Sequence, residues 1–574
     1  MSLIDYIVIV LYILGIVGSG MVFAGKMKNS KDMFAAGGQS PWWVSGLSGF
    51  MTMFSAGTFV VWGGIAYKFG FVAVAISMCY GISALLVGWF LAGYWRKLGV
   101  NSAAEFLQLR FGGSIVQFYT WFQGIIGIFG MGGAVYALAK IVCALMPLPE
   151  GHILADPATG QLSVPFTSVT ICVMVILITF SGGLWAVLMT DVLQFVILTV
   201  SVIFVVPLIL GKAGGWGAFI DAAPEGFTSP VASDFTWWFL VGWVVIHFFK
   251  IGGEWAFVQR YTCVPSAKDA KKAAYIFGVM YLVSPIFWMM PPLVFRILNP
   301  SVDQEQAYIL ACQYVLPAGM MGLMVAAMAS ATASMATTQL NVFAGAFTTE
   351  VYQRLINKSA TDKQLVTTGR VFTVVLGMLV IAGALLIPRY GYTRFILDLT
   401  TLLTGPLVLP TIWGLFSKKI GMKAVWATTL IGFAAAALVK FGVANGGFLT
   451  GVGFLQPLIE FVGAHMRISD LMVGILVPFI VLVILELFEK HEHPGWERVM
   501  KSKADFHEVP TQKSSNMPAK MVVVTLAVIG IMMSALALFN RAEGKVLFTF
   551  SLVLFGISGL VFFLIRRTES SATI

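Results

Sequence analysis

Charged residues are scarce in this chain of 574 amino acids, since Asp, Glu, Lys and Arg together make up only 11% of it. A soluble globular domain carries roughly 25% charged residues, and a disordered chain needs high charge with low hydrophobicity. The chain, 58% hydrophobic, fits neither class. Its apolar runs are long and unbroken, unlike the short alternating strands of an outer-membrane barrel. The composition therefore predicts an all-α protein that crosses a membrane many times.

Cysteine is also scarce, and nucleotide-binding motifs are missing. The five cysteines form no C-x-x-C pair, and most of them lie inside apolar runs, which argues against a disulfide framework or a zinc site. The G-x-x-x-x-G-K-[ST] pattern of ATP-driven machines does not occur. We therefore expect neither an enzyme nor a resident cofactor.

Fifteen apolar segments are predicted to span the membrane. The first is interpreted as a span rather than a signal peptide, because its only early charge is acidic and its apolar run is too long. The segments cover residues 3–23, 41–66, 71–95, 114–146, 165–182, 185–211, 236–258, 270–297, 312–350, 367–388, 395–416, 421–441, 467–488, 520–539 and 546–566.

The basic residues predict how the chain is oriented. Lys and Arg cluster after nearly all odd-numbered segments, whereas residues 147–164 contain neither. Because cytoplasmic loops carry the excess of Lys and Arg, we expect the N-terminus outside and the C-terminus in the cytoplasm. The net charge of +10 then reflects these loops and not nucleic-acid binding. Residues 489–519 are predicted to form a cytoplasmic linker, and the absence of outer glycosylation sequons favours a bacterial inner membrane.

Three charged residues share one stripe of the seventh segment. His247, Lys250 and Glu254 are spaced by three and four residues, which places them on one helical face. They form either a self-neutralising Lys–Glu pair or the polar wall of a solute cavity. Two glycines, Gly252 and Gly253, lie between the last two and favour local unwinding.

Asp191 is a second unusual feature, because no basic residue lies one turn away on its own helix. A bound cation would compensate this carboxylate, and hydrogen bonding or protonation are the alternatives. The ninth segment carries a run of hydroxyl residues, which either pack helices or bind a hard cation through oxygen. The run comprises Ser330, Thr332, Ser334, Thr337 and Thr338.

The second segment is interrupted by Gly46, Gly49 and Gly57, and the seventh is interrupted as described above. The two lie five helices apart, which is the spacing expected of two inverted repeats that each begin with a broken helix.

Three stretches are similar to the solute:sodium symporter family of sugar, proline and sialic-acid carriers. They are Pro41-Trp42-Trp43, the run from Gly182 through Asp191 to Gln194, and Gln259-Arg260 followed by 267–270. The resemblance implies a LeuT-type 5+5 inverted repeat and alternating access driven by sodium. The implied parts are a leading helix with its loop (1–40), repeat one (41–211), repeat two (236–416) and accessory helices (417–574).

The resemblance also implies where sodium binds. The family's common site takes backbone carbonyls that align with Met51, Phe54 and Ala331, and a hydroxyl that aligns with Ser334. Its second hydroxyl position is Met335, a poor ligand for a hard cation. A second pattern, found in some members, falls on the intact positions Asp191, Ser334, Thr337 and Thr338. Either coupling is expected to rely on this second arrangement, or the ion is expected to slide toward it.

The solute positions depart further from the family. Ser55 and Thr58 align with hydroxyl positions of sialic-acid carriers, whereas most sugar-binding positions are replaced. The expected solute-binding residues are Ser55, Thr58, Ser77, His247, Lys250, Glu254 and Tyr281.

The cationic Lys250 favours a solute with an anionic group. We therefore predict a sodium-coupled importer of a small polar solute, a sugar or a sugar acid. A proton-coupled carrier on the same fold and a transporter-derived membrane sensor are the alternatives. The expected partners are the solute, sodium and the bilayer, and the oligomeric state is left open.

Overall fold

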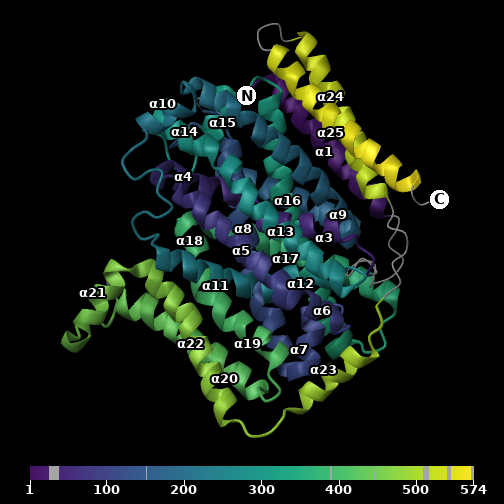
Figure 1. The fold of residues 1–574 in the computed structure, drawn as a ribbon, viewed down its shortest axis with the longest axis vertical. Coiled ribbons are helices and arrows are strands. Elements are labelled where there is room, and N and C mark those ends of the chain that lie inside the picture. Colours follow the sequence, from purple (N-terminus) through teal and green to yellow (C-terminus); the bar gives the residue numbers. More distant parts are fainter. Residues whose placement is uncertain are drawn as a thin grey trace.

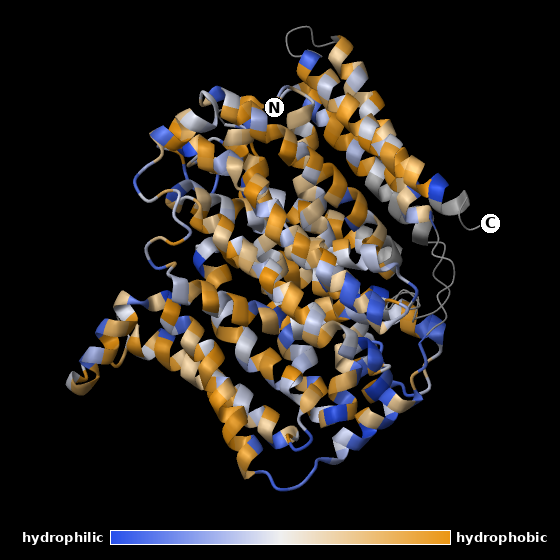
Figure 2. Ribbon diagram, viewed as in Figure 1, coloured by the Kyte–Doolittle hydropathy of each residue, from blue (hydrophilic) through white to orange (hydrophobic). Residues whose placement is uncertain are grey.

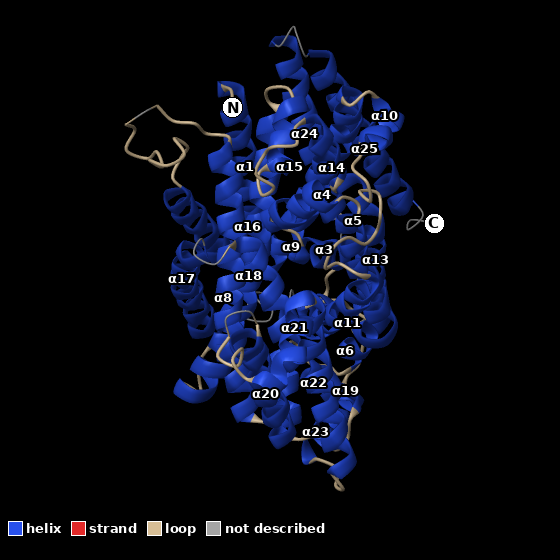
Figure 3. Ribbon diagram, turned by 90° about the vertical axis from the view of Figure 1, so that its left-hand side faces the viewer, coloured by secondary structure: helices blue, strands red, loops and turns tan. Residues whose placement is uncertain are grey.

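The computed structural model describes residues 1–24, 38–149, 151–387, 391–444, 447–508, 516–539 and 544–570. Within these residues the protein is helical, and its only β-structure is a few isolated bridges (Figure 3). Eleven helices are long and apolar enough to cross a membrane, or up to thirteen if each of two bent pairs counts as one span. The first and fifth predicted segments appear as the shorter apolar helices Leu3–Gly15 and Val164–Leu177. The predicted all-α membrane fold is confirmed.

The helices fall into three groups along the chain. The first group contains α1 (Leu3–Ala24), α3 (Trp42–Met53), η2 (Thr58–Trp62), α4 (Gly63–Phe69), α5 (Val72–Val87), η3 (Gly88–Ala92), α6 (Gly93–Lys97), α7 (Ala103–Phe111), α8 (Gly113–Ala144) and α9 (Val164–Lys212).

The second group contains α10 (Gly215–Ala222), α11 (Trp237–Gly253), α12 (Trp255–Thr262), α13 (Ala267–Trp288), α14 (Met290–Leu298), α15 (Ala307–Val315), α16 (Met320–Ala346), η4 (Phe347–Ile356), α17 (Asp362–Leu386), α18 (Tyr392–Asp398), η6 (Leu399–Leu403) and α19 (Thr404–Phe416). The third contains α20 (Met422–Ala437), η7 (Leu438–Val443), η8 (Gly453–Leu455), α21 (Gln456–Ala464), α22 (Met466–Phe488), α23 (Pro494–Asp505), α24 (Met517–Phe539) and α25 (Gly544–Ser570).

Both predicted broken spans are broken in the structure. Helices α3 and η2–α4 meet at 59°, and α11 and α12 meet at 56°. The first break begins at Phe54, whose backbone is extended, and the second lies at Glu254 (φ −69°, ψ 137°). The second break thus follows directly after the glycine pair at 252–253. These breaks place backbone groups and side chains of two spans at mid-depth in the bundle.

Helix α9 covers the fifth and sixth predicted segments as one element. Its 49 residues would extend about 74 Å if straight, against a bilayer core of about 30 Å. Both of its ends lie at the same face of the protein. Near the start of α9, Thr167 contacts Cys143, one turn beyond Lys140, which is paired with Glu305. After its end, α10 contacts α14, which precedes the loop with Glu305. The element therefore crosses the bundle and returns.

The accessory helices flank the bundle on two sides (Figure 1). Helices α24 and α25 pack against each other beside α1 and α9, whereas α20 and α22 cover α19 on the other side. Hydrophobic residues predominate along the long helices, and hydrophilic residues gather at helix ends and connecting loops (Figure 2).

Part of the predicted cytoplasmic linker is folded. Helix α23 lies inside residues 489–519 and buries Val499. The side chains of Arg498 and Ser502 donate hydrogen bonds to the carbonyls of Leu109 and Leu98. This linker helix therefore packs on the ends of α7 and α6 and is not fully solvated.

Candidate functional site

A cavity of about 210 Å³ lies between the two broken helices and the spans that face them. It is lined by α3, η2, α5, α8, α11, α12, α16 and the α18–η6–α19 span. Pockets for drug-sized ligands measure roughly 300–1,000 Å³, so this cavity suits a smaller molecule. Its position beside both breaks follows from the interrupted backbone, which leaves room that two continuous helices would fill.

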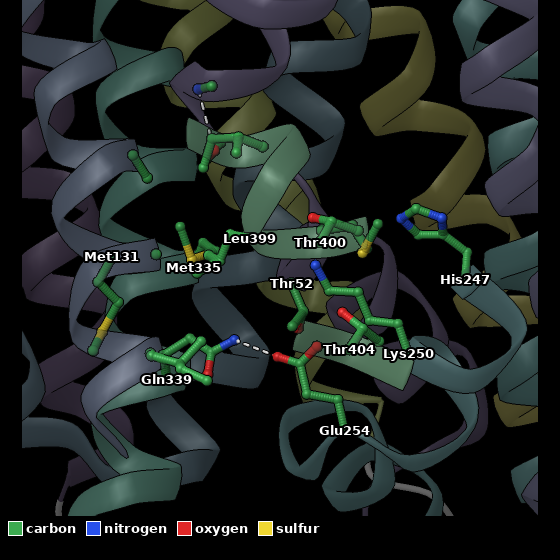
Figure 4. A pocket seen from close by; sticks show the side chains of 18 of the residues that line it. Thr52, Met131, His247, Lys250, Glu254, Met335, Gln339, Leu399, Thr400 and Thr404 are labelled. Atoms are coloured by element: carbon green, nitrogen blue, oxygen red, sulfur yellow. Dashed lines mark hydrogen bonds between the residues drawn. The ribbon is translucent and has the colours of Figure 1, made fainter. Parts of the chain in front are cut away.

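Lys250 is the positive group of the cavity. Its ammonium points toward the centre, between Thr52 and Thr400 (Figure 4). Among the described residues, no carboxylate lies within 4.0 Å of its Nζ atom, so the Lys250–Glu254 pair considered above is not formed. An uncompensated cation at membrane depth is costly unless a partner of opposite charge binds it.

Glu254 sits at the break between α11 and α12 and takes a different partner. Its Oε1 accepts a hydrogen bond from Nε2 of Gln339 on α16 at 3.3 Å, as drawn in Figure 4. Lys250 and Glu254 therefore do not pair with each other. Glu254 ties its break to α16, and Lys250 remains directed at the cavity.

His247 lies one turn before Lys250 and is 1% exposed. Its Nδ1 contacts the carbonyl oxygen of Trp243 at 2.9 Å, and as the donor of that bond it leaves Nε2 as an acceptor. The ring is directed toward the side of the cavity that carries Thr400 (Figure 4). His247 can therefore accept a hydrogen bond from a solute hydroxyl.

The remaining lining combines hydroxyl groups with aromatic rings. The predicted residues Ser55 and Thr58 line the cavity beside the first break. Further hydroxyls come from Thr52, Thr400 and Thr404, and aromatic rings come from Trp62, Tyr80, Trp243 and Tyr392. Hydroxyl donors and acceptors beside flat apolar rings suit a small molecule that is itself rich in hydroxyls.

Two of the expected solute residues do not line the cavity. The hydroxyl of Ser77 donates to the carbonyl of Ala73 at 2.8 Å, within its own helix. Tyr281 is buried against Phe50, with ring centroids 4.4 Å apart. The structure thus gathers five of the seven expected residues around one space.

Asp191 lies in a separate, fully buried cluster. Its carboxylate accepts a hydrogen bond from the hydroxyl of Ser48, and its Oδ2 is 3.9 Å from Nη2 of Arg260. The same Nη2 donates to Oγ1 of Thr338 at 2.9 Å, and Nε of Arg260 donates to Ser48 at 3.0 Å. One arginine therefore brings together Asp191 of α9, Ser48 of α3 and Thr338 of α16.

Two buried oxygens in this region make no hydrogen bond within the described part of the chain. They are Oδ1 of Asp191 and Oγ of Ser334. Thr337 donates to the backbone oxygen of Ser334 at 2.9 Å, which leaves its own lone pairs available. Oxygen atoms of this kind are the ligands that hard cations take.

The common-site positions lie where the first break meets α16. The backbone N–H of Ala56 donates to Thr332 at 2.8 Å, which holds the unwound segment against the turn that carries Ala331 and Ser334. Met51, Phe54 and Ala331 are all buried. Met335, at the position where the resemblance implies a second hydroxyl, lines the cavity.

Sequence reasoning missed several members of both sites. The sequence marks Arg260 only as part of a motif, because its contact with Asp191 joins residues on different helices. Gln339 gave no signal, since amides are common on helices. The wall formed by Thr400 and Thr404 has a visible signal, the hydroxyl-rich run of residues 400–404, which periodicity alone does not assign to a cavity.

Comparison with known proteins places these features in context. The model of the Sodium:solute symporter family matches residues 33–432. The sodium/sialic acid symporter NanT of Aliivibrio fischeri is 28% identical over 402 residues, covering 67% of this chain and 76% of NanT. The sodium/glucose cotransporter of Vibrio parahaemolyticus is 25% identical over 486 residues, covering 77% and 86%.

Solved structures show the same architecture. The outward-open, substrate-bound state of a Na⁺-coupled sialic acid symporter superposes with a TM-score of 0.67 at 22% identity, covering 83% of this chain and 98% of that one. Mhp1, a nucleobase-cation-symport-1 transporter, gives a TM-score of 0.51 at 14% identity, with 83% and 99% covered. These likenesses confirm the predicted LeuT-type fold.

Proposed function

Because the chain belongs to the sodium:solute symporter family, we propose that it is a secondary carrier that uses sodium to import a small, hydroxylated organic anion such as a sugar acid. The observation that carries the solute class is Lys250, a cavity-facing ammonium with no carboxylate within 4.0 Å among the described residues. A carboxylate on the solute would compensate this charge.

The rest of the lining supports the same class of solute. Ser55, Thr58 and His247 offer hydrogen bonds to hydroxyl groups, and Trp62 and Trp243 offer flat apolar faces. Tyr281 and Ser77 are proposed to act behind the lining, because they lie outside it. The relatives named for sialic acid and for glucose are consistent with a sugar-like solute.

Sodium is proposed to bind at Asp191, Ser334, Thr337 and Thr338. The unpaired oxygens Asp191 Oδ1 and Ser334 Oγ support this location. Arg260 already faces the other oxygen of Asp191, so sodium would share that carboxylate with it. The carbonyls of Met51, Phe54 and Ala331 beside the first break are proposed as a second, weaker location, because Met335 supplies no oxygen there.

The proposed cycle couples the two sites through α3 and α16. Sodium bound between α9 and α16 would stabilise an ordered first break, which contributes Ser55 and Thr58 to the cavity. Each sodium that enters across 100 mV, inside negative, contributes about 2.3 kcal/mol, or roughly a fortyfold accumulation of solute. The inverted repeats are proposed at 41–211 and 236–416, and the N-terminus outside a bacterial inner membrane.

The experiment compares matched solutes in proteoliposomes. Uptake of radiolabelled glucuronate and glucose is measured with an inward sodium gradient, with an inward proton gradient and with neither. The proposal predicts sodium-driven uptake of glucuronate above glucose, and its loss in Lys250→Met. Uptake of glucose that Lys250→Met leaves intact would contradict the anion assignment. Uptake driven by protons alone would contradict sodium coupling.

A further inference from the structure

We infer that the accessory helix α22, which lies outside the family-matched residues, is a positioning element that sets one wall of the solute cavity. This wall is the α18–η6–α19 span, which contributes Tyr392, Thr400 and Thr404 to the lining. Helix α22 packs on η6 and α19 from outside the cavity. Three separate contacts tie α22 to this span. One lies near each end of α22, and one lies in the middle.

The first contact is an ionic cluster at one end, in which the Asp470 carboxylate is buried and its partners are partly exposed. Nζ of Lys440 on η7 lies 2.7 Å from Oδ2 of Asp398, the last residue of α18, and 3.9 Å from Oδ2 of Asp470 on α22. The Asp470 side chain is 1% exposed, and Arg394 approaches Asp398 at 3.8 Å. Buried charges hold their partners strongly, because separating them leaves a charge uncompensated. Lys440 therefore fixes the start of η6 relative to α22.

The second contact is a crossing of two glycines in the middle. A methyl group at Gly474 would overlap the carbonyl oxygen of Thr401, and one at Gly405 would overlap the carbonyl oxygen of Gly474. The two backbones touch directly, as small residues allow in membrane helices. Thr404, the neighbour of Gly405, lines the cavity. Any side chain at this crossing must therefore displace either α22 or the cavity wall.

The third contact lies at the other end. Oε2 of Glu486 accepts hydrogen bonds from Nε1 of Trp413 at 3.0 Å and from Oγ of Ser417 at 2.6 Å. Asp470 and Glu486 are separated by sixteen residues, or about 24 Å along the helix, which is most of the bilayer core. Because α22 is fixed at both ends and touches η6 between them, it holds the wall in position.

The test follows cysteines introduced into the cavity, so it does not depend on which solute is carried. Thr404→Cys reports the accessibility of the wall that α22 contacts, and Ser55→Cys reports the accessibility of the opposite wall. All five native cysteines are buried, and protein without the new cysteine gives the background. The measured quantity is the rate of modification by a small methanethiosulfonate reagent in detergent.

Each probe is combined with a change in α22 and a matched control. Gly474→Ala crowds the crossing, and Gly530→Ala crowds a glycine of α24 far from the cavity wall. Glu486→Ala removes the end contact, and Glu489→Ala removes an exposed carboxylate nearby. The second pair keeps the test decisive if Gly474→Ala does not fold.

The expected result is a change of at least fivefold at Thr404→Cys in both Gly474→Ala and Glu486→Ala. The rate at Ser55→Cys should stay within twofold, as should both rates in the control variants. A rate at Thr404→Cys that is the same in every folded background, whether fast or absent, would overturn the inference. If the wild-type protein shows no sodium-driven uptake, the proposed function is overturned, but this inference about α22 still stands.

Discussion

The guanidinium Nη2 of Arg260 lies 3.9 Å from Oδ2 of Asp191, and the two side chains are 1% and 0% exposed. The pair joins α12, which follows the second break, to α9. Through Ser48 and Thr338 the same arginine reaches α3 and α16. The carboxylate proposed to bind sodium is therefore already part of a network that joins α3, α9, α12 and α16.

This network predicts strong coupling between its two charges. Arg260→Gln and Asp191→Asn should each lower the free energy of unfolding by about 3–5 kcal/mol, because each leaves one buried charge unpaired. The double variant should lose clearly less than the sum of the two. Thermal or denaturant unfolding in detergent measures this cycle. Additive losses of unfolding free energy would show that the two side chains do not interact.

A second prediction concerns the first break. A methyl group at Gly57 would overlap the hydroxyl of Tyr392, which lines the cavity. Gly57→Ala should therefore displace Tyr392 and weaken solute binding by about 1–3 kcal/mol, seen as a higher KM for uptake. The matched control is Gly130→Ala on α8, which also lines the cavity but has no atom within 4 Å of an added methyl group. Equal effects of the two variants would refute this explanation.

A third prediction concerns Asp5 on the leading helix. Its Oδ1 accepts hydrogen bonds from the backbone N–H groups of Gly319 and Gly322 at 2.7 and 2.8 Å, at the start of α16. A carboxylate that caps a helix N-terminus contributes about 1–2 kcal/mol. Asp5→Ala should lower the melting temperature, whereas Ser2→Ala, which removes only a hydroxyl bonded to Asp5, should change it far less. An unchanged melting temperature in Asp5→Ala would contradict this cap.

A fourth prediction concerns pH and the linker helix α23. Nδ1 of His493 accepts hydrogen bonds from Gly495 at 3.1 Å and from Arg110 at 3.3 Å. Burial, followed by the charges of Arg110 and Arg498, lowers the pKa of His493, and Glu489 opposes this shift. When α23 is docked on α7, His493 therefore binds a proton less readily than when α23 is undocked. Docking is unaffected above the ordinary pKa of about 6.5 and weakens as the pH falls below it.

Amide hydrogen exchange of residues 494–505 at pH 7.5 and 5.5, corrected for intrinsic rates, measures this effect. Protection should fall at pH 5.5 in the wild type and in His491→Gln, which changes an exposed neighbour. It should not depend on pH in His493→Gln. Acid-sensitive protection that persists in His493→Gln would assign the effect to another group.

Much of the fold could be predicted from the sequence, because the membrane imposes simple rules. Apolar length defined the spans, and the glycines around residues 46–57 and 252–253 indicated both breaks. The exact residues of each break, Phe54 and Glu254, depend on packing against α16. Helix α9 continues through residues 182–185, where the apolar pattern predicts a boundary between two segments.

The site was predictable only in part, for a related reason. His247, Lys250 and Glu254 share one helix, so their spacing is visible in the sequence. Arg260 with Asp191, and Gln339 with Glu254, are contacts between residues 69 and 85 positions apart, and no local pattern records them. The position of Ser77 and Tyr281 behind the cavity lining depends on helix rotation, which apolar composition does not fix.

The most direct test of sodium coupling is the melting temperature of the purified protein in sodium, potassium and choline chloride at equal ionic strength. A ligand at a hundred times its Kd stabilises the folded state by about 2.7 kcal/mol. We predict a rise that is specific to sodium, that is lost in Asp191→Ala and that persists in Lys250→Met. A sodium-specific rise that Asp191→Ala leaves unchanged would contradict the proposed ion site. Equal melting temperatures in all three salts would contradict sodium binding itself.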